Sequence, residues 1–295
     1  MRPIKVALVH ADHPRHKDSR MVGIWSYPVP EFEVTRFPQE KYVDLSRLQF
    51  QEFDVIFQED ARMRVTWNDK GDTPLIYYVV DSTLSSNHYR ERRVAAEQAD
   101  LVLVDWDRLE RFAGSAPVRR LSHCVNDRMF APKYGDYTTD VGFFFHHTPE
   151  RLQLHEGIFK LCKHNGYTYQ FGQRGGVAYA KSLARCKINI NLNRNPETRT
   201  HRCFDVMASR SCLLTSPLPT VSDELKGDGC YGIYKDGELE TMILVLLKTS
   251  KWQAISNAGY ELIQEHHTWA VRARQLADII RHHFDIPRTK RFQVD

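Results

Sequence analysis

One short segment of this sequence carries ionisable side chains at a spacing that could bind an anion. Residues 197–216, ETRTHRCFDVMASRSCLLTS, begin with charged groups and then become apolar, as a buried helix and strand would. The segment connects a predicted strand ending at Asn193 to a predicted helix beginning near Arg202. A helix N-terminus has free N–H groups and a partial positive charge, which favour phosphate. Arg194, Arg199 and Arg202 could add charge-assisted hydrogen bonds to the same anion.

Two acids lie within the same segment. Glu197 and Asp205 are eight positions apart, so both could flank the anion and accept hydrogen bonds from sugar hydroxyls. The alternative is that the arginine and aspartate side chains only cap and solvate the start of a helix. The residue types alone leave both readings open.

Further polar side chains follow other predicted strands, where a parallel sheet binds ligands. His147 and Arg151 follow a strand of the second half and could approach the same anion. In the first half, polar residues also end or follow the predicted strands at 4–10 and 75–81. They belong either to polar loops or to a site that contacts a second substrate, and they are His10, Asp12, His13 and Asp81.

No metal site is expected from the sequence. Asp105 and Asp107 form an Asp-x-Asp pair, but they follow a strand, and we interpret them as a strand end and a helix cap. His146 and His147 are adjacent, with no third ligand at a suitable spacing.

The elements that must position these residues alternate between strand and helix. In the first half, strands are predicted at 4–10, 32–37, 54–59, 75–81 and 101–105, with helices at 44–53 and 88–99. In the second half, strands are predicted at 140–146, 167–172, 188–193, 212–216 and 230–235, with helices at 148–165, 177–186 and from about 202. Three helical stretches end the chain. This alternation predicts an α/β protein with two doubly wound domains.

The composition is that of an ordinary globular protein. The chain has 295 residues, 42% apolar and 26% charged, with a formal charge of +4 that would help to recruit an anionic ligand. The longest apolar run, MILVLL, is far shorter than the roughly 20 residues that span a bilayer. Six cysteines without a C-x-x-C pair predict buried, reduced thiols, so a cytoplasmic location is expected, the host cytoplasm if the protein is viral.

Several stretches together resemble the group-1 glycosyltransferases, especially the CgeB-like branch. The matching residues are Asn191 and Asn193 on one strand, the run Arg202-Cys203-Phe204-Asp205, then Gly259, His267-Thr268-Trp269 and Arg272. The resemblance covers roughly residues 118–285. It implies the glycosyltransferase-B fold, in which two Rossmann-like domains face a cleft. The expected parts are an acceptor-side domain (1–125), a linker (126–139), a nucleotide-sugar domain (140–268), and a C-terminal helix and tail (269–295) that could return to the first domain.

The resemblance also implies a reaction and residue roles. A sugar would pass from a nucleotide-sugar, such as a UDP-sugar, to a hydroxyl, with retained anomeric configuration and without a metal or other cofactor. Glu197 would lie near the transferred sugar, Asp205 would bind the ribose, and Asn191, Asn193 and His201 would join the donor site. Two departures stand out: Asp205 replaces a glutamate, and Arg210 replaces a glycine that follows the helix.

The acceptor is open. Basic loops in the first half, which include His88 and Arg90, are either solvated surface or a groove for an anionic acceptor such as DNA. His13 and Asp81 are the catalytic candidates on this side. Phage enzymes of this fold glycosylate hydroxymethylated pyrimidines, so such a base is a candidate acceptor. The alternatives are a cell-surface glycan, a nucleotide-sugar epimerase of similar architecture, or a non-catalytic coat or structural protein with the same fold.

Overall fold

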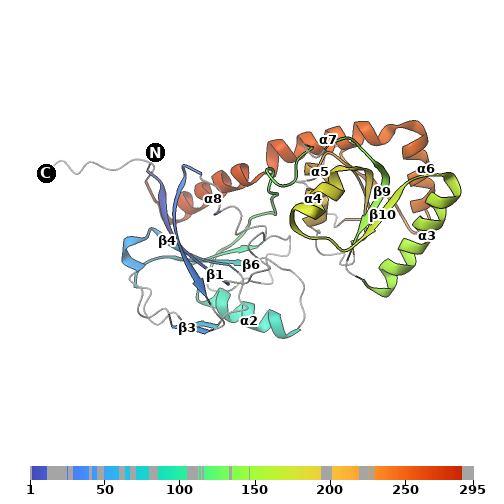
Figure 1. The fold of residues 1–295 in the computed structure, drawn as a ribbon. Coiled ribbons are helices and arrows are strands. Elements are labelled where there is room, and N and C mark those ends of the chain that lie inside the picture. Colours follow the sequence, from blue (N-terminus) through green and yellow to red (C-terminus); the bar gives the residue numbers. More distant parts are fainter. Residues whose placement is uncertain are drawn as a thin grey trace. The chain divides into compact units, whose positions relative to one another are not determined.

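The computed structural model describes residues 2–11, 25, 29–39, 42–44, 50–59, 64–66, 71–79, 86–104, 112, 114, 116–132, 135–145, 147–193, 201–218, 225 and 229–287. The chain divides into two compact units. The first comprises Met1–His123 and Trp269–Asp295, and the second comprises Cys124–Thr268. The first unit is therefore built from two separate stretches of sequence, with the second inserted between them (Figure 1).

The first unit contains a parallel sheet in the order β2-β1-β4-β6-β7-β8. Every residue of β4, β6 and β7 is buried, as expected for strands covered on both faces. A separate parallel pair joins β3 to β5. The strands are β1 (Ile4–Ala11), β2 (Phe32–Gln39), β3 (Tyr42–Asp44), β4 (Val55–Glu59), β5 (Arg64–Thr66), β6 (Leu75–Val79), β7 (Leu101–Val104) and β8 (Val118–Arg120).

Helices α2 (Ser86–Glu97) and α8 (Trp269–Phe284) lie on either side of these strands (Figure 1). Helix α8 is amphipathic and buries Ala273, Leu276 and Ile280. Its Arg272 donates a hydrogen bond from Nη2 to the backbone oxygen of His123 at 2.9 Å. The last helix of the chain thus contributes core to the first unit.

The helix predicted over residues 44–53 is wrong in the part that the structure describes. Tyr42–Asp44 is strand β3, and Phe50–Glu52 is a single 3-10 turn, η3. The turn exists because Phe50 is 2% exposed and packs edge-to-face against Phe37, with ring centroids 5.9 Å apart. Of the apolar residues in this stretch that the structure describes, Phe50 is buried and Phe53 is partly buried. The three-residue strands β5 and β8 were not predicted, because they are too short for a periodic pattern.

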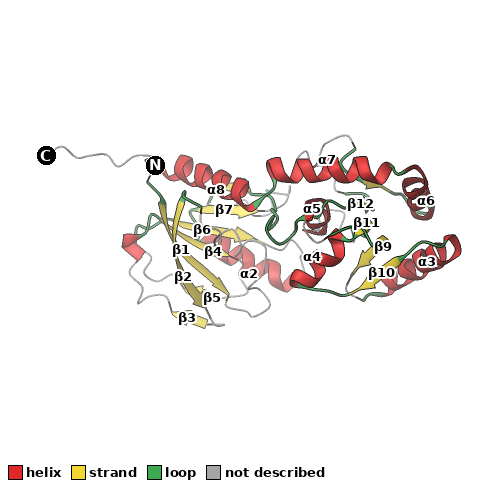
Figure 2. Cartoon of the chain, turned by 45° about the horizontal axis from the view of Figure 1, so that its top comes forward, coloured by secondary structure: helices red, strands yellow, loops and turns green. Residues whose placement is uncertain are grey.

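The second unit contains a parallel sheet in the order β10-β9-β11-β12-β13. Figure 2 shows helices of this unit beside the strands of its sheet. The elements are β9 (Thr139–Phe144), α3 (Pro149–Asn165), β10 (Tyr169–Gly172), α4 (Gly176–Ala184), β11 (Cys186–Asn191), α5 (His201–Ala208), β12 (Cys212–Thr215), β13 (Gly232–Ile233), α6 (Leu239–Thr249) and α7 (Lys251–His266).

Two apolar clusters cover the two faces of this sheet. Ile188 and Ile190 of β11 pack with Ile158 of α3 and Ile243 of α6. On the opposite face, Leu213 of β12 packs with residues of α4, α5 and α7, among them Leu183, Phe204 and Ile263. The strand order and the two-sided helix cover confirm the predicted α/β fold class.

The second unit, which contains every cysteine of the sequence, agrees with the prediction for the thiols. All six cysteines are buried and none is in a disulfide. Burial raises the pKa of Cys186 and of Cys212 to about 12, so these thiols are neutral at physiological pH. None of the helices in the described ranges is long and apolar enough to cross a membrane.

Candidate functional site

The strand order of the second unit marks one position on its sheet as the favoured ligand site. The chain runs from β9 outward to β10, then returns past β9 to β11 and continues through β12 to β13. The order of the strands therefore reverses between β9 and β11, which are hydrogen-bonded neighbours. Open parallel sheets bind ligands outside the carboxyl ends of the strands at such a reversal. The segments that leave β9 toward α3 and β11 toward α5 border this position.

Helix α5 begins at the same edge of the sheet. Its first turn holds His201 and Arg202, both half-buried, and contains no acidic residue. Six of its eight residues are buried, from Cys203 to Ala208, so packing fixes the helix axis. The N-terminus of α5 therefore presents a partial positive charge that no carboxylate of its own first turn offsets.

The Arg202 side chain is held from one side. Its Nη1 donates a hydrogen bond to Oδ1 of Asn191, the last residue of β11, at 3.4 Å. Its Nε is buried and has no hydrogen-bond partner among the described residues. An arginine has five N–H donors in a planar fork, so the single hydrogen bond to Asn191 leaves donors of this guanidinium without a partner among the described residues.

Two further side chains at this edge have buried polar atoms without a partner in the described part of the chain. Asn193, two residues past β11, has neither Nδ2 nor Oδ1 in a hydrogen bond. Thr148 precedes α3 at its N-cap position, yet its Oγ1 is buried and makes no cap hydrogen bond. Buried polar groups are nearly always satisfied, so such groups call for an explanation. A polar ligand over the ends of β9 and β11 would satisfy both.

A network of hydrogen bonds from β12 and the region of β13 holds the end of β11 in place. The backbone N–H of Asn193 donates to Oγ of Ser216 at 2.8 Å. The backbone oxygen of Asn191 accepts from the Ser216 N–H at 3.0 Å and from the Tyr234 hydroxyl at 3.1 Å. Sequence reasoning did not pick out Ser216, Tyr234 or Thr215. For Thr215 and Ser216 the sequence carried a signal, because this polar pair ends the apolar run CLLTS.

The other predicted residues are placed unevenly. Asp205 lies in the second turn of α5 and is 2% exposed. His147 is exposed at the end of the β9 segment, and Arg151 is in the first turn of α3. His10 is the next-to-last residue of β1, and both His88 and Arg90 lie in α2, but their side chains are outside the described part. The residues that lie outside the described ranges altogether are Asp12, His13, Asp81, Arg194, Glu197 and Arg199.

Arg210, which stands where the related pattern has glycine, adopts the left-handed conformation that favours glycine. Its φ is +55°, two residues after α5 ends. Its backbone oxygen accepts a hydrogen bond from the Tyr137 hydroxyl at 2.5 Å. Its side chain donates to Oδ1 of Asn257 at 2.8 Å and stacks over Tyr260, 5.6 Å from the ring centroid. The turn thus keeps its shape with an arginine in it.

Gly259 and His267, which belong to the C-terminal part of the family resemblance, pack against neighbouring elements. A Cβ on Gly259 in α7 would lie 2.7 Å from the backbone oxygen of Cys230 and 3.0 Å from Cγ of Met207 in α5. His267 is 2% exposed and packs edge-to-face on Phe204 of α5, with centroids 5.2 Å apart. These two residues let α7 and its end lie close to α5, the helix that carries Arg202.

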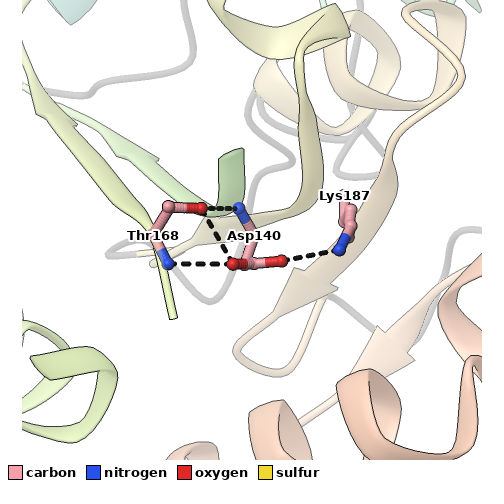
Figure 3. Close-up of polar contacts among 3 residues, drawn as sticks. All are labelled: Asp140, Thr168 and Lys187. Atoms are coloured by element: carbon pink, nitrogen blue, oxygen red, sulfur yellow. Dashed lines mark hydrogen bonds and ion pairs between the residues drawn. The ribbon is translucent and has the colours of Figure 1, made fainter. Parts of the chain in front are cut away.

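The opposite edge of the sheet holds an ion pair that belongs to the structure of the second unit (Figure 3). Asp140 at the start of β9 accepts hydrogen bonds from Thr168 N–H and Oγ1, both at 2.8 Å, and from Lys187 Nζ at 2.7 Å. Burial raises the pKa of the Asp140 carboxyl, but the hydrogen bonds from Lys187 and Thr168 outweigh it, and the pKa is lowered overall. The pair ties the amino ends of β9, β10 and β11 together. In the described ranges, no group of three histidine, cysteine or acidic side chains is placed to hold a metal ion.

Comparisons with known proteins bear on the family and the fold of this chain. Residues 157–278 match the family described as glycosyl transferase-like. No curated protein matches the sequence significantly.

Three solved structures illustrate the likeness in fold. Anabaena HepE in complex with UDP-glucose is 13% identical, with a TM-score of 0.59 over 95% of this chain and 100% of that chain. The sucrose-phosphate synthase of Thermosynechococcus elongatus is 12% identical, with a TM-score of 0.60 over 96% and 99%. An alpha-glucosyltransferase in complex with UDP-glucose and DNA containing an abasic site is 11% identical, with a TM-score of 0.64 over 94% and 99%.

These likenesses extend over both units, and the family match covers most of the second. The CgeB-like branch stays a prediction. The chain therefore has the glycosyltransferase-B fold, with a glycosyl transferase-like segment at residues 157–278, and the resemblance seen in its sequence is confirmed at that level.

Proposed function

We propose that this protein is a glycosyltransferase that moves a sugar from a nucleoside diphosphate sugar to an acceptor hydroxyl. One observation carries the proposal. At the reversal of strand order in the second sheet, the N-terminus of α5 and the partly unpaired guanidinium of Arg202 lie beside the end of β11. The buried, unpartnered amide of Asn193 follows that strand end. This combination suits a pyrophosphate attached to a sugar.

The chemistry follows from the charges. When the bond between the anomeric carbon and the phosphate breaks, negative charge grows on the departing nucleoside diphosphate. The N–H groups of α5 and the Arg202 guanidinium are fixed before the reaction and stabilise that charge as it forms. A donor of this kind contributes about 10²–10³ in rate. Arg194, Arg199, His201, His147 and Arg151 are proposed to contact the same donor.

The remaining roles come from the resemblance and stay proposals. Glu197 would lie near the transferred sugar, and Asp205 would bind the ribose. The reaction would retain the anomeric configuration and need no metal. UDP is the nucleotide we propose, because HepE and the alpha-glucosyltransferase were each solved with UDP-glucose.

The acceptor is proposed to bind the first unit, near the carboxyl ends of β1 and β6. His10 is the next-to-last residue of β1, and His13 and Asp81 follow β1 and β6 in the sequence. Asp12, His88 and Arg90 are proposed to contact the acceptor. The structure of the alpha-glucosyltransferase with DNA favours testing DNA with a hydroxymethylated pyrimidine as the acceptor.

Two measurements test the proposal. Isothermal titration with UDP compares the wild-type protein with Arg202→Ala and with Arg274→Ala, which removes an arginine from an exposed position of α8. Loss of a charged hydrogen bond predicts at least about tenfold weaker UDP binding for Arg202→Ala, and unchanged binding for Arg274→Ala. Equal affinities of all three proteins would remove the phosphate site from α5.

The second measurement is a mass-spectrometric screen of UDP-sugars against hydroxymethylated DNA and cell-surface glycans. A product with the added sugar identifies the acceptor, and the anomeric proton coupling in its NMR spectrum tests retention. DNA retention at low salt, lost steeply as salt rises, would support a DNA acceptor. Failure to bind any nucleotide-sugar would favour a non-catalytic protein of the same fold.

A further inference from the structure

Asn191 was predicted to bind the donor, but its surroundings point to a different task. Its side chain is 0% exposed. The strand alternates Ile188-Asn189-Ile190-Asn191, and the two isoleucines pack on the face covered by α3 and α6. The asparagines therefore face α5. Asn191 has no surface for a ligand, yet its amide reaches the guanidinium of Arg202.

A chain of hydrogen bonds sets the direction of this amide. Thr215 of β12 is also 0% exposed, and its hydroxyl donates to the backbone oxygen of Ser216 at 2.9 Å. A hydroxyl has one proton to donate, so Thr215 Oγ1 can only accept from Asn191, whose Nδ2 lies 2.9 Å away. With Nδ2 committed to Thr215, Oδ1 must point toward Arg202.

We propose that Asn191 and Thr215 form a positioning pair that aims the Arg202 guanidinium at the phosphates of the donor, without touching the donor themselves. The proposal rests on the function proposed above. The reverse orientation of the amide would place an NH₂ group against the guanidinium, two donors facing each other. Thr215, on the neighbouring strand β12, prevents this reverse orientation because its hydroxyl accepts from the amide NH₂ group. The hydrogen bonds that the backbone oxygen of Asn191 accepts from Ser216 and Tyr234 hold the end of β11 in place.

This pair makes a prediction that a purely structural role does not. If Thr215 acts through Arg202, loss of its hydroxyl must weaken phosphate binding only while Arg202 is present. Thr215→Val deletes the hydroxyl at nearly constant volume, and Thr215→Ser keeps it. Asp140→Asn is a control, because it weakens the second unit at the opposite edge of the sheet.

The experiment measures the affinity of the full-length protein for UDP and for inorganic pyrophosphate by isothermal titration. The proteins are the wild type, Thr215→Val, Thr215→Ser, Asp140→Asn, Arg202→Ala and the double variant Arg202→Ala/Thr215→Val. Thermal melts confirm that each is folded. We expect Thr215→Val to weaken both ligands about tenfold, and Thr215→Ser and Asp140→Asn to stay within about twofold of wild type.

The double variant decides the inference. Binding as weak as that of Arg202→Ala alone supports a pair that acts through the guanidinium, since residues in one network couple. Fully additive losses would overturn it, as would wild-type affinity of Thr215→Val. If Arg202→Ala itself binds UDP and pyrophosphate like the wild type, the proposed phosphate site fails as well, and that result is distinct from additive losses.

Discussion

Arg210 allows the backbone strain in the second unit to be measured separately from side-chain contacts. The residue has φ +55°, a conformation that costs a residue with a Cβ about 1–2 kcal/mol. Replacing Arg210 with alanine keeps that strain and removes the hydrogen bond to Asn257 and the stacking on Tyr260. Replacing it with glycine removes the same contacts and the strain.

The difference in stability between the two variants therefore contains only the backbone strain and the flexibility that glycine adds to the unfolded chain. Glycine gains about 1–2 kcal/mol in the folded state and loses about 0.4–1 kcal/mol because its unfolded chain is more flexible. Arg210→Gly should thus be about 1 kcal/mol more stable than Arg210→Ala. Both lack an exposed hydrogen bond and a cation–π contact worth about 0.5–1 kcal/mol each, so Arg210→Ala should be the least stable of the three proteins.

The assay is urea unfolding of the three proteins, followed by circular dichroism. Far-UV spectra and unchanged m-values establish that the variants share the native fold and the same unfolded state. A midpoint for Arg210→Gly equal to or below that of Arg210→Ala would show that the strain does not exceed the about 0.4–1 kcal/mol that glycine loses through its more flexible unfolded chain. The argument from φ would then be refuted, and the arginine would need no explanation at this position.

Three further predictions concern the same unit. Asp140→Asn should lower the free energy of unfolding by about 1–2 kcal/mol at neutral pH. Because the pKa of Asp140 in the folded protein lies below its ordinary 3.8, this difference between variant and wild type should shrink as the pH falls below that value. Urea titrations of both proteins from pH 7 to pH 3 would test this. Gly259→Ala should destabilise the protein by about 1–3 kcal/mol in thermal melts, because the added Cβ would meet the backbone oxygen of Cys230. In Gly157→Ala, the control in α3, the added Cβ would meet only the Glu240 carboxylate at 3.3 Å, so this variant should be neutral or stabilising. Similar melting temperatures for the two variants would count against the close packing of α7. Arg202→Ala should slow sugar transfer at least a hundredfold with an unchanged melting temperature, and normal turnover would exclude its role at the leaving phosphate.

The sequence predicted most elements of the second unit because each is long or apolar enough to show its period. Helix α3 ends where expected, at Asn165, since Gly166 follows with φ +70°. The predicted helix over 44–53 failed because apolar spacing cannot distinguish a helix from a turn anchored by one buried ring. Among the residues that the structure describes, the pattern marked buried side chains in both stretches, Ile158 and Cys162 in α3 and Phe50 in η3.

The candidate site was predicted only in part. The arginine at the start of α5 was identified from charge and from its place before an apolar run. The Asn191–Thr215 pair that contacts this arginine was not identified. Its hydrogen bond depends on the pairing of β11 with β12, which joins residues 24 positions apart in the sequence. The alternation Ile-Asn-Ile-Asn carried a usable signal, since it places both asparagines on the face opposite the isoleucines. Of these two asparagines, we predicted Asn191 as a donor contact, and its full burial is the basis of the positioning role proposed above.

The division of the first unit into two stretches of sequence has a consequence for how the protein is made. A ribosome completes Cys124–Thr268 before it synthesises α8, so the inserted unit can fold while its host sheet still lacks a helix. Until then, the surface destined to receive Ala273, Leu276 and Ile280 is open to chaperones and to other nascent chains. The inserted unit is accordingly the natural fragment to produce alone, and a fragment that stops at His123 would leave its sheet uncovered.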